Sequence, residues 1–383
     1  MKRNYLVQVL IICLAFTSCK DKSEPNTEYL ENMKTAYVGT YTREEGFVDG
    51  EAKGIYTIYQ EPESGSLRFG TTVAEITNPS FVKISGDGKN LYAVSELGGQ
   101  GEENGFIHSF RIKEDQGLEE LNKLSTESTA PCHVALDRSG EYVFVANYMG
   151  GVVMMYKRQE DGSLKKQQRI DLKNPEESHA HSVTLSEDNK YAYIADLGND
   201  KILIYNFDAD QGEITPHEQA FVALEEGAGP RHFTIYEEIK VAYSVNELNS
   251  SVTVFKIKES GGLEIIQNIA TLPEDFSERN SGADIHLHSS GKFLYTSNRG
   301  HNSIAAFAVD EEGKLSTLDF YPTDGKTPRN FAIAPKGDFL YVANQDSGEI
   351  SIFRINQETG ELTQKLPNVE VKTPVCIEFV PVE

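Results

Sequence analysis

The stretch FLYVAN at positions 339–344 decides the fold, because six variants of it recur along the chain. The variants are rich in Tyr, Val, Ile and Phe and end in a small or polar residue, which is typical of a strand followed by a turn. They are TAYVGT (35–40), LYAVSE (91–96), YVFVAN (142–147), YAYIAD (191–196), VAYSVN (241–246) and FLYTSN (293–298). The seven runs end 56, 51, 49, 50, 52 and 46 residues apart, which indicates a repeat of about 50 residues.

Three further strand patterns accompany these runs. A second run such as VVMMY (152–156) follows each one, and a Gly-centred turn such as DGSL (161–164) then leads into a third. A fourth, such as PCHVALD (131–137), precedes six of the seven. Four short strands per repeat and no long helical pattern predict an all-β fold, a seven-bladed β-propeller of four-stranded blades.

The two ends of the repeat array predict how the ring closes. The first repeat lacks its leading strand, whereas the chain ends with a leading strand that has no repeat of its own, PVCIEFV at 374–380. We therefore expect the N-terminal strands to pair with this C-terminal strand in one blade, which would close the ring and remove an exposed strand edge.

The N-terminal segment predicts export. A basic start is followed by an apolar stretch at 6–16 and a small residue before Cys19, which resembles a lipoprotein signal peptide. We expect residues 1–18 to be cleaved off and Cys19 to be lipidated; an uncleaved anchor or an ordinary secretory signal is the alternative. Residues 19–34 have too few apolar side chains to pack, so we expect a flexible tether before a propeller at 35–383.

Charge and cysteine content exclude several classes of protein. A formal net charge of −23 would repel nucleic acids and anionic membrane surfaces, so we expect neither as a partner and membrane contact only through the lipid. With Cys13 in the signal and Cys19 lipidated, Cys132 and Cys376 are too few for a disulfide framework. We expect a monomer whose fold rests on its hydrophobic core.

A set of motifs resembles a known family. In order along the chain they are YVGTYT, NPSF, PCHV, ANYMGG, HAHS, GPRHF, NELNS, SNRGHNSI and TPRNF. In this order and spacing they resemble the seven-bladed propeller lactonases, the family of bacterial 6-phosphogluconolactonase and of a fungal carboxymuconate cycloisomerase. The resemblance implies chemistry on a lactone without a metal or other cofactor.

Strand topology predicts where the polar residues gather. In each blade the loop into the innermost strand and the loop after the second strand open on the same face, so both surround one mouth of the channel. The innermost strands supply Ser80, Cys132, His133, His181, Arg231, His232, Asp284, Arg329 and Asn330. The ends of the second strands supply Glu96, Asn147, Tyr148, Asp196, Asn246, Glu247, Asn298, Arg299 and His301. Three arginines in an acidic protein indicate an anionic substrate, such as a sugar lactone or sugar acid.

The resemblance also implies which of these residues act. At its motifs it assigns catalysis to His181 in HAHS, Arg231 in GPRHF, Glu247 in NELNS and Arg299 in SNRGH. Opening a lactone needs a base for water and a donor for the oxyanion, so Glu247 or His181 is the expected base and the two arginines are the expected stabilisers. We expect the substrate to be bound by His133, His232, Asn298, His301, Arg329 and Asn330.

Two alternatives concern single residues at this mouth. The pair His179 and His181, together with His133 and His232, could hold a metal, but the three arginines would repel a cation. Cys132 is a second candidate, as a nucleophile, but no spacing singles it out, so a small buried thiol without a chemical role is the preferred interpretation.

The sequence leaves the function open among three classes. The first is a lactonase of the 6-phosphogluconolactonase type, the second a non-enzymatic envelope propeller that binds a glycan or a protein, and the third a cycloisomerase that forms lactones. The expected lipoprotein signal places the protein in the periplasm, the outer membrane or the surface of a Gram-negative cell. A phosphorylated sugar lactone is a cytoplasmic compound, so this location favours a different sugar-acid lactone as substrate.

Overall fold

The computed structural model describes residues 33–46, 48–102, 104–364 and 366–381. The signal peptide at 1–18, Cys19 and the tether as far as residue 32 lie outside these residues, so the expectations about them stay predictions. No helix in the described part of the chain has the length and the apolar character needed to cross a membrane.

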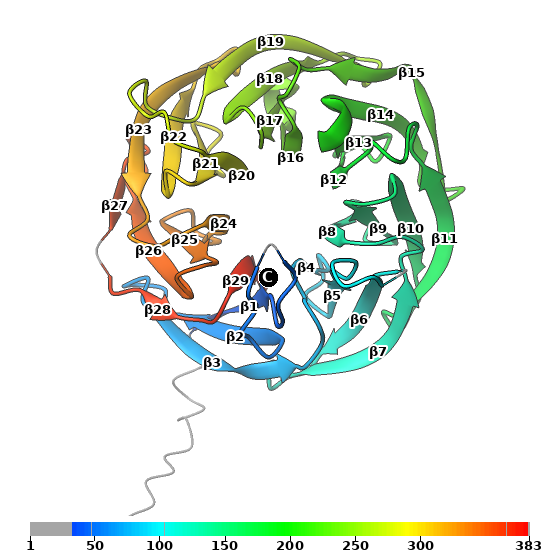
Figure 1. Cartoon of the computed structure of the whole chain (residues 1–383), viewed down its shortest axis with the longest axis horizontal. Helices are drawn as coiled ribbons and strands as arrows, with labels where there is room; N and C mark the ends of the chain where they lie inside the picture. The colour runs from blue at the N-terminus through cyan, green and yellow to red at the C-terminus, as the bar shows by residue number, and fades with distance from the viewer. Residues whose placement is uncertain (1–32, 47, 103, 365, 382–383) are drawn as a thin grey trace, which may run out of the picture.

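Seven antiparallel sheets stand around a central channel, each with one strand innermost and its successors farther out (Figure 1). The predicted seven-bladed propeller is therefore confirmed. The first three complete blades along the chain contain β4 (Val82–Ile84), β5 (Asn90–Ser95), β6 (Phe106–Ile112) and β7 (Leu118–Ser125); β8 (Pro131–Leu136), β9 (Tyr142–Asn147), β10 (Val152–Arg158) and β11 (Leu164–Asp171); and β12 (Ala180–Leu185), β13 (Tyr191–Asp196), β14 (Lys201–Asp208) and β15 (Glu213–Ala223).

The next three blades repeat the arrangement. They contain β16 (Pro230–Tyr236), β17 (Val241–Asn246), β18 (Ser251–Ile257) and β19 (Leu263–Ala270); β20 (Ser281–Leu287), β21 (Phe293–Arg299), β22 (Ser303–Val309) and β23 (Leu315–Pro322); and β24 (Pro328–Ile333), β25 (Phe339–Asn344), β26 (Glu349–Ile355) and β27 (Leu362–Gln364), with β28 (Val369–Glu370) also paired to β26. Two short 3₁₀ helices, η1 (Leu197–Asn199) and η2 (Glu237–Ile239), lie in turns.

The last blade is built from both ends of the chain. Its innermost strand is β29 (Pro374–Phe379), which pairs with β1 (Lys34–Thr40), and β2 (Ile55–Gln60) and β3 (Leu67–Ala74) follow outward. Figure 1 shows β29 in red against β1 in blue at the inner edge of the ring. Closure by this pairing was predicted and is confirmed.

A repeated tyrosine joins neighbouring blades. Six of the seven second strands carry a buried tyrosine near their middle, three residues before the last strand residue in five of them and four before it in β21. Its hydroxyl donates to a carbonyl in the outer turn of the next blade; the donors are Tyr37, Tyr92, Tyr193, Tyr243, Tyr295 and Tyr341. Phe144 takes the seventh position. The acceptor for Tyr341 is Gly65, whose φ of +78° and contact with the Phe339 ring leave no room for a side chain. This hydrogen bond, repeated at six junctions, helps to fix the position of each of these blades relative to the next.

Candidate functional site

Bulges in the innermost strands build the floor of the site. In five blades the pairing with the second strand skips one residue near the start of the innermost strand. The skipped residue is Val375 in the blade that closes the ring, and in the other four blades it is Cys132, His181, Arg231 or Arg329. A β-bulge leaves the extra residue unpaired and re-aims its side chain. Three of the four line one cavity of about 770 Å³, and Arg231 lines a small void of about 10 Å³ that also touches Cys132 and Arg329.

The wall of the same cavity comes from the residues that follow the second strands. The residue directly after the second strand lines the cavity at Glu96, Tyr148, Glu247 and Gln345, and so does Arg299, the last residue of β21. Glu247 is held in place by its backbone, because its N–H donates to Gly229 O at 2.7 Å and its carbonyl accepts from Gly282 N at 3.0 Å. A Cβ on Gly282 would lie 2.6 Å from Asn246 O, so only glycine permits this approach of β20 to β17.

Glu247 pairs with two arginines. Its Oε2 lies 3.0 Å from Nε of Arg231 and 2.9 Å from Nη2 of Arg299, which comes from the next blade. Burial alone would raise the pKa of Glu247, but the charges of Arg299, Arg231 and Arg329 outweigh it and lower the pKa. Glu247 is therefore an ionised carboxylate that holds two guanidinium groups at the cavity.

A third arginine, Arg329, also lines this cavity and has its own partners. Arg329 lies over the ring of Tyr41, with 5.4 Å between the guanidinium carbon and the ring centroid, and the Tyr41 hydroxyl donates to Glu96 Oε2 at 2.8 Å. Burial alone would lower the pKa of Arg329, but Tyr41, Glu96 and Glu247 outweigh it and raise the pKa. The cavity thus has a permanently charged guanidinium on its second side as well.

His181 lines the same cavity. Burial, together with the positive charges of Arg231 and the neighbourhood of His232, holds the pKa of His181 well below its usual range, so the imidazole is neutral at pH 7. Its ring packs edge-on against Tyr148, with 5.7 Å between the centroids. Burial raises the pKa of Tyr148, which keeps its phenol protonated and able to donate. A proton acceptor and a proton donor therefore lie side by side in this cavity.

The thiol of Cys132 lies 3.8 Å from Nδ1 of His181, but it is buried and protonated. Its Sγ lies 3.6 Å from His181 O and 3.7 Å from Ala180 O, where a thiol proton can be donated to carbonyl oxygens. Burial raises the pKa of Cys132 strongly, so the reactive thiolate does not form at neutral pH.

Not all of the residues expected at this mouth lie there; His133, His232, Asp284 and Asn330 line the opposite cavity instead. His133, His232 and Asn330 each follow a bulged residue, so their side chains turn away from it and line a cavity of about 800 Å³ at the opposite end of the channel. His232 and Asn330 also touch the small void between the two cavities. The sequence placed both residues of each PCH, PRH and PRN motif at one mouth because an unpaired bulge cannot be recognised from spacing alone.

Asn298 and His301 also lie outside the cavity lining. Asn298, one residue before the end of β21, is fully buried; its amide donates to Thr271 O at 2.7 Å and so holds a loop rather than facing the channel. His301 Nδ1 lies 2.7 Å from Ser303 Oγ, and its ring packs edge-on against Phe276 with 4.8 Å between the centroids. Both side chains support the loops around the mouth.

Sequence reasoning missed two residues near the cavity. Tyr41 follows the strand that ends at Thr40, which is the position that Glu247 occupies in its own blade, so the repeat itself could have identified it. Arg279 lines the cavity from the loop before β20, and this loop differs in length from its counterparts, so no repeat position pointed to it. Within the described residues, no cluster of three or more His, Cys, Asp and Glu side chains is arranged to hold a metal ion.

Comparison with known proteins agrees with this architecture. The family described as "Lactonase, 7-bladed beta-propeller" matches residues 35–379. A 6-phosphogluconolactonase of Bacillus subtilis is 32% identical over 354 residues, 90% of this chain and 97% of its own, and one of Formosa agariphila is 35% identical over 345 residues, 86% of this chain and 95% of its own. The structure of a periplasmic gluconolactonase of Pseudomonas aeruginosa superposes with a TM-score of 0.85 at 31% identity, covering 92% of this chain and all of that one. The chain therefore belongs to the lactonase family of seven-bladed β-propellers.

Proposed function

We propose that this lactonase hydrolyses a sugar lactone to its hydroxy acid in the cavity between Arg231, Arg329 and His181. The observation that carries the proposal is the neutral imidazole of His181, which shares one cavity with Arg299 and Arg329 and with a carboxylate that holds Arg231. The names of the relatives support a lactone substrate, since two are 6-phosphogluconolactonases and one is a gluconolactonase. Membership of a family of lactonases favours an enzyme over a propeller that only binds a glycan or a protein.

His181 is the proposed base. Glu247 is the weaker candidate because two guanidinium groups already share its charge and lower its pKa. The pKa of His181 is low in the free enzyme because of burial and the charge of Arg231. An anionic substrate, or the oxyanion formed from it, would neutralise part of this positive charge and raise the pKa of His181. The imidazole would thus become a better base once substrate is bound.

The reaction then follows from the arrangement of charges. His181 takes a proton from water, and the hydroxide adds to the lactone carbonyl carbon. The carbonyl oxygen becomes an oxyanion, which the guanidinium groups at the cavity and the phenol of Tyr148 stabilise. The ring oxygen leaves as the C–O bond breaks and receives the proton from His181, which gives a carboxylic acid and a free hydroxyl group.

We propose that no metal ion takes part. The cavity lining already carries the cations Arg299, Arg329 and Arg279, with Arg231 at its floor, and further positive charge would be repelled. Guanidinium groups can stabilise the oxyanion without one, because their planar N–H pairs match two oxygen atoms.

We also propose that the protein acts outside the cytoplasm as a lipoprotein. The expected signal at residues 1–18 and Cys19 supports export, as does the similarity to a periplasmic gluconolactonase. Intact-mass analysis of the protein from membrane fractions should give a diacylated or triacylated chain that begins at Cys19. A chain that retains residues 1–18 would contradict this proposal.

The test of the function is a panel of lactones. The full-length mature protein is mixed with gluconolactone, 6-phosphogluconolactone and related sugar lactones, and acid release is followed with a pH indicator with and without a chelator. We expect hydrolysis well above the spontaneous rate, unchanged by the chelator. The His181→Asn variant should lose this activity, whereas His217→Asn, which removes a buried histidine bonded to Ser260 O at 2.7 Å in an outer strand, should keep it. No acceleration of any lactone would contradict the proposal, and lactone formation from an unsaturated acid would favour the cycloisomerase.

A further inference from the structure

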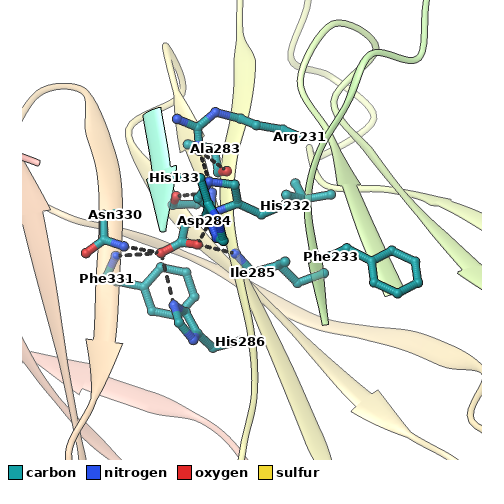
Figure 2. A network of polar contacts seen from close by, with 12 residues as sticks. His133, Arg231, His232, Phe233, Ala283, Asp284, Ile285, His286, Asn330 and Phe331 are labelled. Carbon is teal, nitrogen blue, oxygen red and sulfur yellow. Dashed lines mark hydrogen bonds and ion pairs between the residues drawn. The ribbon is translucent and has the colours of Figure 1, made fainter. Parts of the chain in front are cut away.

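A polar network below the cavity connects Arg231 to the interior of the neighbouring blades. The network centres on Asp284 of β20, a carboxylate with a solvent-exposed side-chain fraction of 4%. Figure 2 shows Asp284 between His232, His286, Asn330 and the backbone of Phe331. These partners come from β16, β20 and β24, so one carboxylate links three successive blades.

Both carboxylate oxygens of Asp284 have several hydrogen-bond partners. Its Oδ1 lies 2.7 Å from Nδ1 of His232 and accepts the N–H of Ile285 at 3.0 Å. Its Oδ2 lies 3.0 Å from Nε2 of His286 and accepts from Asn330 Nδ2 at 2.6 Å and from Phe331 N at 3.2 Å. Burial alone would raise the pKa of Asp284, but the charge of His286 and the bonds from both histidines hold it well below its usual range. Asp284 is therefore an anion that can only accept.

An acceptor at this position determines the tautomer of His232. Since Nδ1 faces a carboxylate oxygen, Nδ1 carries the proton, and Nε2 is left with a lone pair. That lone pair faces Nη1 of Arg231 at 3.1 Å. Burial and the charge of Arg231 lower the pKa of His232 to about 4, which keeps the ring neutral at pH 7 and preserves this lone pair.

The same guanidinium has two other anchors. Its Nη1 also donates to Ala283 O at 2.5 Å, on the residue beside Asp284, and its Nε forms an ion pair with Oε2 of Glu247 at 3.0 Å. Three contacts of different direction therefore hold one planar group, and two of them lead to the segment around Asp284.

We propose that Asp284 and His232 form a positioning pair for Arg231: the carboxylate fixes the imidazole with its lone pair toward the guanidinium, and the imidazole fixes the guanidinium beneath the cavity. The inference rests on the proposed function only in that Arg231 acts on the lactone. His232 and Asp284 themselves do not touch the substrate, since His232 and Asp284 face the opposite cavity.

Two substitutions of His232 separate its two hydrogen bonds. An Asn amide reaches about as far as Nδ1 of His, so His232→Asn can still donate to Asp284 but offers nothing to Arg231. A Gln amide reaches about as far as Nε2, so His232→Gln can still accept from Arg231 but loses Asp284. Loss of a hydrogen bond to a charged group lowers a rate constant roughly 10- to 100-fold when that bond positions the group for catalysis. We therefore expect kcat/KM to fall by this factor in His232→Asn and by less in His232→Gln.

A double-substitution cycle distinguishes positioning from mere support of the fold. If His232 acts through Arg231, then His232→Asn should cause no further loss in an Arg231→Lys background; losses that multiply would overturn the proposal. The matched control is His288→Asn, which removes a buried histidine bonded to Gly337 O at 2.8 Å and should lower the melting temperature without changing kcat/KM.

A readout independent of activity is the nitrogen NMR spectrum of the wild-type protein with labelled histidine. We expect His232 to be protonated at Nδ1 and bare at Nε2 at pH 7. The opposite tautomer or a doubly protonated ring would overturn the positioning pair even if the enzyme is fully active. If the protein opened no lactone but showed the expected tautomer, the proposed function would fail and the positioning pair would stand.

Discussion

Nε of Arg231 lies 3.0 Å from Oε2 of Glu247, although one residue is at the start of the innermost strand of a blade and the other follows its second strand. The chain goes down one strand and returns along the next, so both residues reach the same face. Arg299 of the next blade completes the group at 2.9 Å. The geometry of the proposed site thus depends on the packing of two blades against each other.

Substitution of His181 should separate the roles of base and orienting carboxylate. With His181→Asn the proton acceptor is lost while the arginines stay in place, so we expect kcat to fall by roughly 10² or more with little change in KM. With Glu247→Gln two buried guanidinium groups lose their counter-charge, so KM should rise as well as kcat fall. Steady-state kinetics of both variants on one lactone provides the measurement. A Glu247→Gln variant that loses only kcat would make Glu247 the base instead.

Arg279 should discriminate between phosphorylated and unphosphorylated lactones. It is exposed at the rim of the cavity, and no salt bridge to it is found among the described residues, whereas Arg231 and Arg299 already pair with Glu247. If the substrate carries a distal phosphate, Arg279→Ala should lower kcat/KM roughly 3- to 10-fold for the phosphorylated lactone and leave the unphosphorylated one unchanged. An equal effect on both would show that Arg279 does not meet a phosphate.

The buried histidines should make the protein sensitive to acid. His133, His181 and His232 have a pKa below the ordinary value of about 6.5, because of burial first and nearby positive charge second, and that of His232 is about 4. Below pH of about 6.5 the unfolded chain binds protons that the folded chain does not, so the free energy of unfolding should fall by about 1.4 kcal/mol per pH unit for each such histidine. Burial alone would lower the pKa of His286, but the charge of Asp284 outweighs it and raises the pKa. His286 therefore stabilises the folded protein at low pH, and this contribution is lost as the pH rises through its pKa in the folded state.

The measurement for this prediction is urea unfolding between pH 7 and pH 5. His133→Gln removes one histidine from the channel and should make the decline with pH shallower by one such contribution. A variant that declines as steeply as the wild type would show that His133 does not cause the effect.

The tyrosine at the closing junction should stabilise the ring. The hydroxyl of Tyr341 donates to Gly65 O at 2.9 Å across the junction between the blade of β24 and the blade of β1. Tyr341→Phe leaves this carbonyl unpaired, so the free energy of unfolding should fall by about 1–3 kcal/mol. Thermal unfolding would detect the change, and lactone hydrolysis at 25 °C should be unaffected. An unchanged melting temperature would mean that water replaces the hydroxyl, as it can where a turn is exposed.

Periodicity alone sufficed to predict the fold. Seven recurrences of a six-residue strand identify seven blades, and the unmatched strand at 374–380 identifies the closure, because strand order follows chain order in a propeller. The first repeat unit begins one residue earlier than expected, since β1 starts at Lys34. Such a shift is ordinary, because strand ends are set by local hydrogen bonds rather than by composition.

The orientation of side chains was less accessible from the sequence. Spacing predicted that Arg231 and His232 share a mouth, but the bulge between Pro230 and His232 separates them: Arg231 lies at the small void between the cavities, and His232 also lines the opposite cavity. In the second repeat the run LYAVSE (91–96) extends one residue beyond the strand, since β5 ends at Ser95 and Glu96 follows it. Aligning the repeats on their buried tyrosines rather than on their last residues places Glu96 and Tyr41 at the position of Glu247. A bulge, by contrast, depends on pairing between strands and has no signature in a single run.

A narrow layer of side chains separates the two cavities, so the cavity that contains His181 is closed at its inner end. Only about 10 Å³ of space remains there among Cys132, Arg231, His232 and Arg329, less than a sugar needs. Substrate must therefore enter, and the acid must leave, through the same opening. In the proposed reaction the product carries a carboxylate that the lactone lacks, so we expect the arginines of the cavity to bind the product more tightly than the lactone. For the proposed reaction we therefore expect release of the acid to limit kcat, and added salt, which screens this attraction, should then raise kcat.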